Sequence, residues 1–153
     1  MGVLFSIIGI VVFLDQLTKF LILSYFPIHA AKEIIPGLFN LVHARNTGAA
    51  FSILAEANSS GRQAFFIAVT LFVLGFLLFG YRKLRRDDTW TRVSYSLISG
   101  GAVGNLIDRL RFGEVVDFLD FYLGTHHWPA FNVADSAITT GALMLLLSLI
   151  RGK

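Results

Sequence analysis

Four apolar stretches alternate with polar stretches along the chain. Residues 64–81 carry no charged side chain over about the length that a helix needs to cross the hydrocarbon layer of a membrane, and residues 136–150 form a second clear run. Residues 1–26 make a third run, interrupted by Asp15 and Lys19, and residues 93–107 make a fourth. This pattern predicts transmembrane helices at about residues 3–26, 62–81, 92–111 and 133–151.

The fourth run, residues 93–107, is the least hydropathic, but its composition suits a membrane helix. It is rich in Gly and Ser, and Gly100 and Gly104 have the GxxxG spacing that allows helices to pack closely in a membrane. Across the chain, 55% of the residues are hydrophobic and 15% are charged, which is not the balance of a water-soluble domain. We therefore expect residues 1–153 to form one integral membrane domain.

Basic residues indicate the orientation of the chain. Residues 82–86 (RKLRR) lie between the second and third spans, and Arg151 and Lys153 follow the last one. The positive-inside rule places both segments in the cytoplasm, so we expect cytoplasmic N- and C-termini. Residues 27–62 and 111–129 should then lie outside. The first span should be retained rather than cleaved as a signal peptide, because no Lys or Arg precedes its apolar run.

Three polar residues on different predicted helices reach a similar depth. At 1.5 Å per residue, Asp15 lies about 21 Å from the start of its helix, Asn105 about 20 Å above Arg92, and Asp135 about 24 Å above Arg151. The hydrocarbon core is about 30 Å thick, so these groups lie in its outer half. Ionisable groups are rare there unless they pair or line a wet cavity, so we predict a functional site.

Each of these polar residues also has a purely structural explanation. Asp15 and Lys19 are four residues apart and can neutralise one another on one helical face, whether or not they also shape a site. Asn105, Asp108 and Arg109 share a face by their spacing. We interpret Asp108 as an interfacial charge near the helix end, whereas Asn105 lies deeper and favours a role in the site.

A pattern at the start of the last span allows both capping and catalysis. Asn132 and Asp135 form an N-x-x-D sequence, which is typical of a helix N-cap and its partner three residues on. Asp117 follows Gly113 in a segment that has left the third span, so the chain can fold it back toward Asp135. The alternative, that Asp117 is an ordinary exposed carboxylate, stays open on spacing alone.

The side chains available limit the chemistry. Cysteine is absent, which excludes disulfides, zinc thiolate sites and a cysteine nucleophile. Neither G-x-S-x-G nor S-x-x-K occurs, HExxH is missing, and the adjacent His126 and His127 cannot share one helical face. The Asn58-Ser59-Ser60 sequon is expected to arise by chance. We therefore expect no metal and no cofactor, and a net charge of +3 is too small to suggest nucleic acid.

Two carboxylates held close together cannot both ionise easily, so one keeps a proton while the other acts as a base. Asp117 and Asp135 are the natural pair, and such a pair can activate water for peptide hydrolysis. The same residues could form a proton relay in a small transporter, although four spans without an inverted repeat disfavour this alternative. A third, non-enzymatic alternative is a binding or structural subunit that does not cut its ligand.

Four sequence blocks resemble the lipoprotein signal peptidase family, also called signal peptidase II. DQLTK at residues 15–19 looks like the family's D-Q-x-T-K element, and NTGAAFS at 46–52 looks like its N-x-G-A-A-F-S loop. GNLIDR at 104–109, followed by VVDF at 115–118, resembles the third block, and PAFNVADS at 129–136 resembles the fourth. Their order around four spans makes coincidence very improbable.

The resemblance implies a bacterial plasma (inner) membrane aspartyl endopeptidase, multi-pass, whose active site faces the extracytoplasmic side. Such an enzyme removes the signal peptide from diacylglyceryl-modified prolipoproteins, cleaving just before the lipidated cysteine. The implied fold is all-α, with four transmembrane helices and a small extracellular β-cradle formed by residues 35–45 and the segment after Arg111. The expected partners are lipidated prolipoproteins and membrane lipids, and we expect a monomer.

By motif match, Asp117 and Asp135 take the catalytic positions. The resemblance also gives a set of residues that line or shape the site: Asp15, Lys19, Asn46, Gly48, Asn105, Arg109 and Asn132. Glu114 and Asp120 are left as surface charges, while Tyr122 and Trp128 suit the outer membrane interface.

Overall fold

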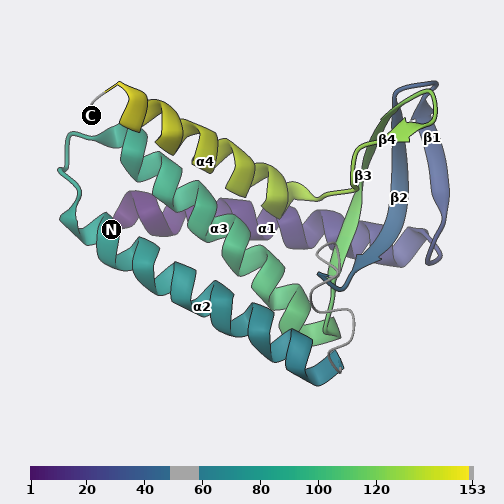
Figure 1. The fold of residues 1–153 in the computed structure, drawn as a ribbon, viewed down its shortest axis with the longest axis horizontal. Helices are drawn as coiled ribbons and strands as arrows, with labels where there is room; N and C mark the ends of the chain where they lie inside the picture. Colours follow the sequence, from purple (N-terminus) through teal and green to yellow (C-terminus); the bar gives the residue numbers. More distant parts are fainter. Residues whose placement is uncertain (49–58, 152–153) are drawn as a thin grey trace.

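The computed structural model describes residues 1–48 and 59–151, which form four helices and a small sheet (Figure 1). The predicted loop motif from residue 49 onward, the outer loop at 55–58 with the sequon's Asn58, and Lys153 lie outside the described residues. The helices lie side by side, and the sheet stands at one end of them, opposite the start of the first helix. The elements in chain order are α1 (Gly2–Tyr25), β1 (Ala31–Ile35), β2 (Phe39–Asn46), α2 (Ser59–Lys83), α3 (Thr89–Phe112), β3 (Val115–Leu123), β4 (His126–His127) and α4 (Val133–Ile150).

The helix α3 is the centre of the bundle, and it contacts α1, α2 and α4. Its glycines allow this, because a Cβ on Gly100 would lie 2.9 Å from the Cβ of Val11 in α1. A Cβ on Gly101 would lie 2.3 Å from the backbone oxygen of Ala134 in α4, which no side chain tolerates. Small residues thus bring α1 and α4 against the backbone of α3, as in closely packed membrane helices.

Three of the four helices, α1, α2 and α4, are long and apolar enough to cross a membrane. Their large apolar side chains face outward; Phe13 and Phe72, for example, are 64% and 76% exposed. A soluble protein would bury much of this surface, whereas a lipid bilayer covers it. The chain is therefore a multi-pass membrane protein. The predicted helix boundaries agree with the structure to within three residues.

The sheet is antiparallel with the strand order β1-β2-β3-β4. It confirms the expected small sheet beside the helices, although its first strand begins earlier than expected, at Ala31. The chain leaves α3 through Gly113, whose φ of 77° suits a glycine, and enters β3 at once. The first residues of β3 are buried, and Val116 and Phe118 pack near Ile22 of α1. This packing fixes the position of Asp117 between them.

Candidate active site

Asn132 links the two predicted catalytic carboxylates. Its side-chain oxygen accepts a hydrogen bond from the Asp135 backbone N–H (2.9 Å), and Asp135 Oδ2 accepts one from the Asn132 N–H (3.3 Å). The predicted cap at the start of α4 is thus confirmed as a reciprocal capping box. Asn132 Nδ2 also donates to Asp117 Oδ1 at 2.7 Å. Asn132 therefore contacts both carboxylates, the one on β3 through its side-chain amide and the one on α4 through its backbone N–H.

Two further asparagines donate hydrogen bonds to the carboxyl oxygens of Asp117 and Asp135 that Asn132 does not contact. Asn46 Nδ2, on β2, donates to Asp117 Oδ2 at 3.0 Å, and Asn105 Nδ2, on α3, donates to Asp135 Oδ1 at 2.7 Å. Each carboxyl group therefore accepts two hydrogen bonds, and three asparagines from three different elements orient the two groups. The structure thus brings together five of the residues that the sequence singled out.

The environment of Asp117 favours its protonated form. Burial, followed by the negative charge of Asp135, raises the pKa of Asp117 from 3.8 to about 7. The hydrogen bonds from Asn46 and Asn132 act in the opposite direction, because they stabilise the ionised carboxylate. Near neutral pH the site can therefore hold a carboxylic acid beside a carboxylate, which is the combination that acid–base hydrolysis requires.

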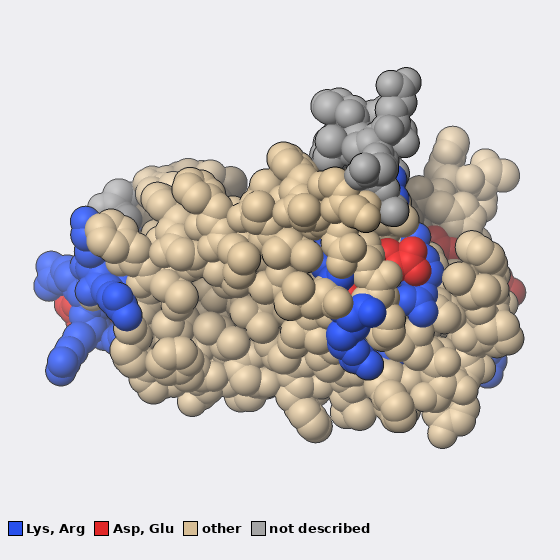
Figure 2. Space-filling model, turned by 90° about the horizontal axis from the view of Figure 1, so that it is seen from below, with Lys and Arg blue, Asp and Glu red and all other residues tan. Residues whose placement is uncertain are grey.

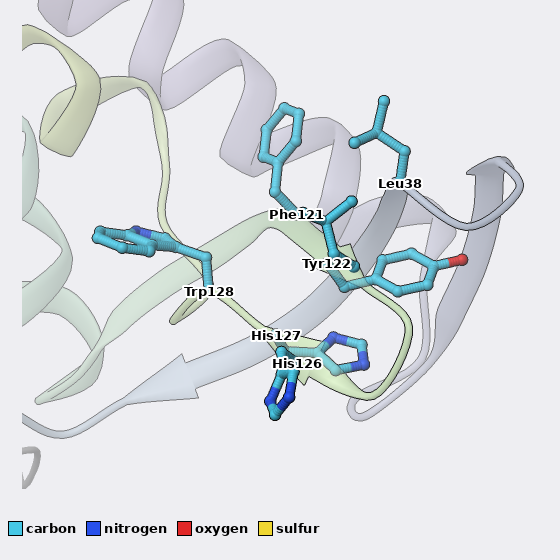
Figure 3. Close-up of a pocket in the computed structure, with 7 residues that line it drawn as sticks. Leu38, Phe121, Tyr122, His126, His127 and Trp128 are labelled. Atoms are coloured by element: carbon cyan, nitrogen blue, oxygen red, sulfur yellow. The ribbon is translucent and has the colours of Figure 1, made fainter.

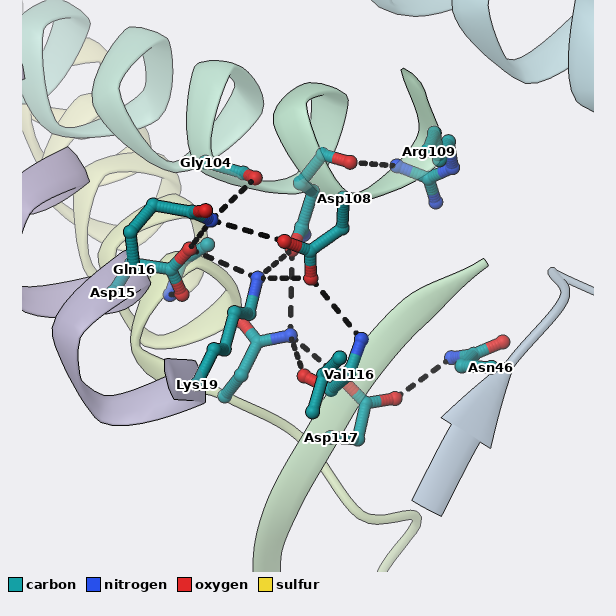
Figure 4. A network of polar contacts seen from close by, with 12 residues as sticks. Asp15, Gln16, Lys19, Asn46, Gly104, Asp108, Arg109, Val116 and Asp117 are labelled. Carbon is teal, nitrogen blue, oxygen red and sulfur yellow. Dashed lines mark hydrogen bonds and ion pairs between the residues drawn. The ribbon is translucent and has the colours of Figure 1, made fainter. Parts of the chain in front are cut away.

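A buried lysine, Lys19, contacts the polar groups next to the pair of Asp117 and Asp135 (Figure 4). Lys19 points from α1 between two carboxylates, with its Nζ 2.9 Å from Asp15 Oδ2 and 2.8 Å from Asp108 Oδ2. The expected ion pair of Asp15 and Lys19 is therefore present. Lys19 Nζ also donates to Asn105 Oδ1 at 3.1 Å. Because Lys19 binds the oxygen of Asn105, the amide nitrogen of Asn105 is left to face Asp135.

The structure corrects the interpretation of Asp108 as an interfacial charge. This residue is 1% exposed, and its Oδ2 accepts a hydrogen bond from the Val116 backbone N–H at 3.1 Å. Its Oδ1 accepts a second from Gln16 Nε2 at 3.0 Å. Val116 directly precedes Asp117, so Asp108 fixes the backbone that carries a catalytic candidate. The sequence held one signal of this burial. Asp108 is three residues from Asn105, so both side chains lie on the same face of α3, the face toward α1.

Asp15 joins two helices at the same level. It is completely buried, and its Oδ1 accepts a hydrogen bond from the Ala134 backbone N–H at 2.9 Å, in the first turn of α4. That turn also presents Asp135. A residue of the first helix thereby fixes the position of the helix start that carries the second carboxylate.

Arg109 and Gly48, two further predicted site residues, lie at the edge of the group formed by the two carboxylates and their asparagine partners. Arg109 lines a pocket of about 290 Å³ together with Asn105 and Asp135, and its guanidinium lies 5.2 Å from the ring centre of Phe66. The backbone N–H of Gly48 donates to Asn46 Oδ1 at 2.8 Å. Gly48 has a φ of 80°, and a Cβ there would lie 2.3 Å from the Phe66 ring. Only glycine suits this position, which helps to orient Asn46.

The structure also corrects the expectation that Asp120 is a surface charge. Its side chain is mostly buried in the sheet, where it accepts hydrogen bonds from Asn40 Nδ2 (2.8 Å) and is 2.9 Å from His127 Nδ1. Glu114, the other expected surface charge, is partly exposed and lies 3.6 Å from Arg45.

In the described ranges, no three His, Asp or Glu side chains are grouped so that they could hold a metal ion.

A separate pocket of about 330 Å³ lies on the sheet (Figure 3). None of its lining residues belongs to the predicted site. Trp128 is 69% exposed beside it, and Tyr122 stacks on His127 with ring centres 4.9 Å apart. The lining residues are Leu38, Phe121, Tyr122, Leu123, His126, His127 and Trp128.

Comparison with known proteins assigns the family. The sequence model described as signal peptidase (SPase) II matches residues 7–151. The chain belongs to the signal peptidase II family. A lipoprotein signal peptidase of Geobacter metallireducens is 52% identical over 98% of this chain and 92% of its own. That of Syntrophotalea carbinolica is 53% identical over 95% and 89%. A bacterial membrane enzyme solved by the in meso method is 36% identical, with a TM-score of 0.89 over 100% of this chain and 96% of that one.

Membership of the signal peptidase II family confirms the function expected from the four sequence blocks. The protein is an aspartic peptidase, and its reaction is the removal of signal peptides from prolipoproteins. The alternatives of a proton-coupled transporter and of a non-cutting binding subunit are therefore set aside.

Replacing the buried lysine should disrupt the site. Lys19→Met leaves Asp15 and Asp108 buried without a cation, and removing one partner of a buried pair costs about 3–5 kcal/mol. We expect a clear fall in thermal stability in detergent, measured by the unfolding midpoint, together with loss of peptidase activity. Lys83→Met, at an exposed position, is the matched control and should change stability by less than about 0.5 kcal/mol. A Lys19→Met variant as stable and as active as the parent would contradict this account of the network.

Proposed function

We propose that Asp117 and Asp135 are the catalytic pair of this signal peptidase II. The observation that carries the proposal is the contact of one buried residue, Asn132, with both carboxyl groups: its side-chain amide donates to Asp117, and its backbone N–H donates to Asp135. The raised pKa of Asp117 supports it, because strongly shifted pKa values of buried carboxyl groups cluster at active sites. The substrate is a diacylglyceryl-modified prolipoprotein, and the scissile bond is the one just before the lipidated cysteine.

In the proposed mechanism, Asp135 takes a proton from a water molecule, which attacks the scissile carbonyl carbon. Asp117 donates its proton to the developing oxyanion, and a proton then passes to the leaving amine as the carbon–nitrogen bond breaks. Burial, together with the charge of Asp135, favours the proton on Asp117 before the reaction begins.

The pocket beside Asp135 is suited to the peptide around the cleavage site. Its polar end carries Asn105 and Arg109, which can bind substrate backbone carbonyls, and these residues adjoin Asp135. The rest of the wall is mostly apolar and comes from α2, α3 and α4, which suits the apolar segment of a signal peptide. The acyl chains of the substrate would stay in the lipid, against exposed phenylalanines such as Phe72. The apolar lining residues are Val69, Val73, Ile98, Ala102 and Ile138.

We further propose that α3 is a fourth transmembrane helix. Its 24 residues extend over about 36 Å, enough to cross the hydrocarbon layer, and its polar side chains face the other helices instead of lipid. With residues 82–86 in the cytoplasm, both termini are cytoplasmic, and the sheet and the two carboxylates lie on the extracytoplasmic side of the bacterial inner membrane. We propose that the protein acts as a monomer, because one chain supplies both carboxylates and no second copy is needed to complete the pair.

Substituting either catalytic carboxylate should stop the reaction. Asp117→Asn and Asp135→Asn each remove a proton-transfer group, and such groups contribute about 10²–10⁴-fold to rate. The measurement is cleavage of a purified diacylglyceryl-modified prolipoprotein, followed by its change in mass. Asp87→Asn, at an exposed position, is the control and should cleave at the parent rate. Full cleavage by both catalytic variants would sink the assignment of the pair.

The pH dependence of cleavage should follow the proton on Asp117. Its pKa of about 7 means that activity falls as the pH rises above this value, because the ionised group has no proton to donate. Asn46 stabilises the ionised form, so Asn46→Ala should raise the pKa and move this decline to higher pH. The measurement is kcat/KM between pH 5 and pH 9.

The matched control for this experiment is Asn40→Ala. The Asn40 amide also donates to an aspartate, but to Asp120 in the sheet, so this variant should leave the pH profile unchanged. A decline that moves to lower pH in Asn46→Ala, or that moves equally in Asn40→Ala, would count against Asp117 as the proton donor.

A further inference from the structure

The end of the bundle opposite the sheet is strongly basic. Figure 2 shows Lys and Arg side chains gathered at this end of the molecule. Five basic and two acidic residues lie between positions 82 and 92, at the end of α2, in the connection that follows it and at the start of α3. These are Arg82, Lys83, Arg85, Arg86 and Arg92, with Asp87 and Asp88. The positive-inside rule explains the number of these charges but not the way in which they are arranged.

A pocket of about 190 Å³ lies among three of these arginines. Neither acidic residue of the connection lines it. Asp87 is 3.1 Å from Arg85 at the surface, and Asp88 caps α3 by accepting a hydrogen bond from the Thr91 N–H at 3.1 Å. The pocket is therefore a local concentration of positive charge with a partly apolar wall. Its lining residues are Met1, Tyr81, Arg82, Leu84, Arg86 and Arg92.

The guanidinium of Arg92 is held in place before any ligand arrives. Its Nε and one terminal nitrogen donate to the Tyr81 hydroxyl at 3.2 and 3.1 Å, and the other terminal nitrogen donates to the Arg86 carbonyl oxygen at 2.9 Å. Tyr81 is only 4% exposed, so its hydroxyl is a fixed anchor. A guanidinium has five N–H groups, and these contacts use three. Among the contacts of the described residues, one N–H group is left on each terminal nitrogen, and guanidinium N–H groups suit phosphate oxygens.

The pocket lies where membrane phosphates are found. The candidate span α2 ends at Lys83 and α3 begins at Thr89, so the pocket is at the surface of the hydrocarbon layer. Trp90 is partly exposed beside α4, and the Arg151 guanidinium lies 5.8 Å from the centre of its ring. A tryptophan paired with an arginine is typical of the boundary between lipid and water. Leu84 adds an apolar wall that suits the glycerol and the upper acyl carbons of a lipid.

We propose that this pocket binds the phosphate diester of an anionic phospholipid such as phosphatidylglycerol. Arg92 donates its two remaining N–H groups to phosphate oxygens, and Arg82 and Arg86 contribute further positive charge. A net-neutral lipid such as phosphatidylcholine brings its own cation next to the phosphate and binds more weakly. The site is distinct from the catalytic pair, which lies near the other end of α3.

The test is lipid binding to the purified protein in a zwitterionic detergent, measured by native mass spectrometry with phosphatidylglycerol and with phosphatidylcholine. Arg92→Gln removes the oriented cation and should weaken phosphatidylglycerol binding about fivefold or more. Tyr81→Phe removes only the anchoring hydroxyl, with no change in charge, and should also weaken it. Arg85→Gln is the matched control, because Arg85 lies outside the pocket and is already paired with Asp87 at 3.1 Å, so its loss should change binding by less than about twofold.

The outcomes are separable. Equal losses in Arg92→Gln and Arg85→Gln, with none in Tyr81→Phe, would show diffuse attraction and overturn the proposal, as would equal binding of the two lipids. Inorganic phosphate that displaces the lipid at millimolar concentration would indicate a site for a free anion and overturn the lipid assignment. Unfolding midpoints in phosphatidylcholine identify a misfolded variant, and Arg86→Gln then replaces it with the same expected loss.

Discussion

The burial of the Lys19 ammonium is the constraint on which the rest of the structure depends. A charge at this depth in a membrane protein must be paired, and Lys19 meets this requirement with Asp15, Asp108 and the oxygen of Asn105. These partners bind other elements in turn, since Asp15 accepts from the start of α4 and Asp108 accepts from β3. One cation therefore holds α1, α3, α4 and the start of β3 together, next to the two carboxyl groups.

This arrangement explains how two carboxyl groups can be held close to each other. Asp117 is carried by the strand that Asp108 fixes, and Asp135 by the helix start that Asp15 fixes. Asn132 lies between them and donates to one while capping the helix that carries the other. Burial, and then the repulsion between two like charges, favours a proton on Asp117 near neutral pH. A helix start that caps itself is also a rigid support for the other carboxylate.

The sequence alone predicted the elements whose signals are local. Apolar runs gave the helices, the four-residue spacing gave the pair of Asp15 and Lys19, and the N-x-x-D pattern gave the cap of α4. It did not predict the burial of Asp108, because periodicity shows which residues share a face but not what packs against that face. Asp120 was missed for a related reason: its partner Asn40 is 80 residues away and is brought to it only by the register of β2 and β3. The assignment of function rested on the motifs, since a proton relay could use the same residues.

The most direct test of the central claim is an infrared titration of the carboxyl C=O stretching band in the purified protein. A protonated carboxyl should lose its proton near pH 7, as the pKa of Asp117 requires, and should be absent from Asp117→Asn. In Asp135→Asn the same band should titrate at lower pH, because the neighbouring negative charge is gone. A band near pH 7 that persists in Asp117→Asn, or no protonated carboxyl above pH 5, would contradict the paired-carboxylate account.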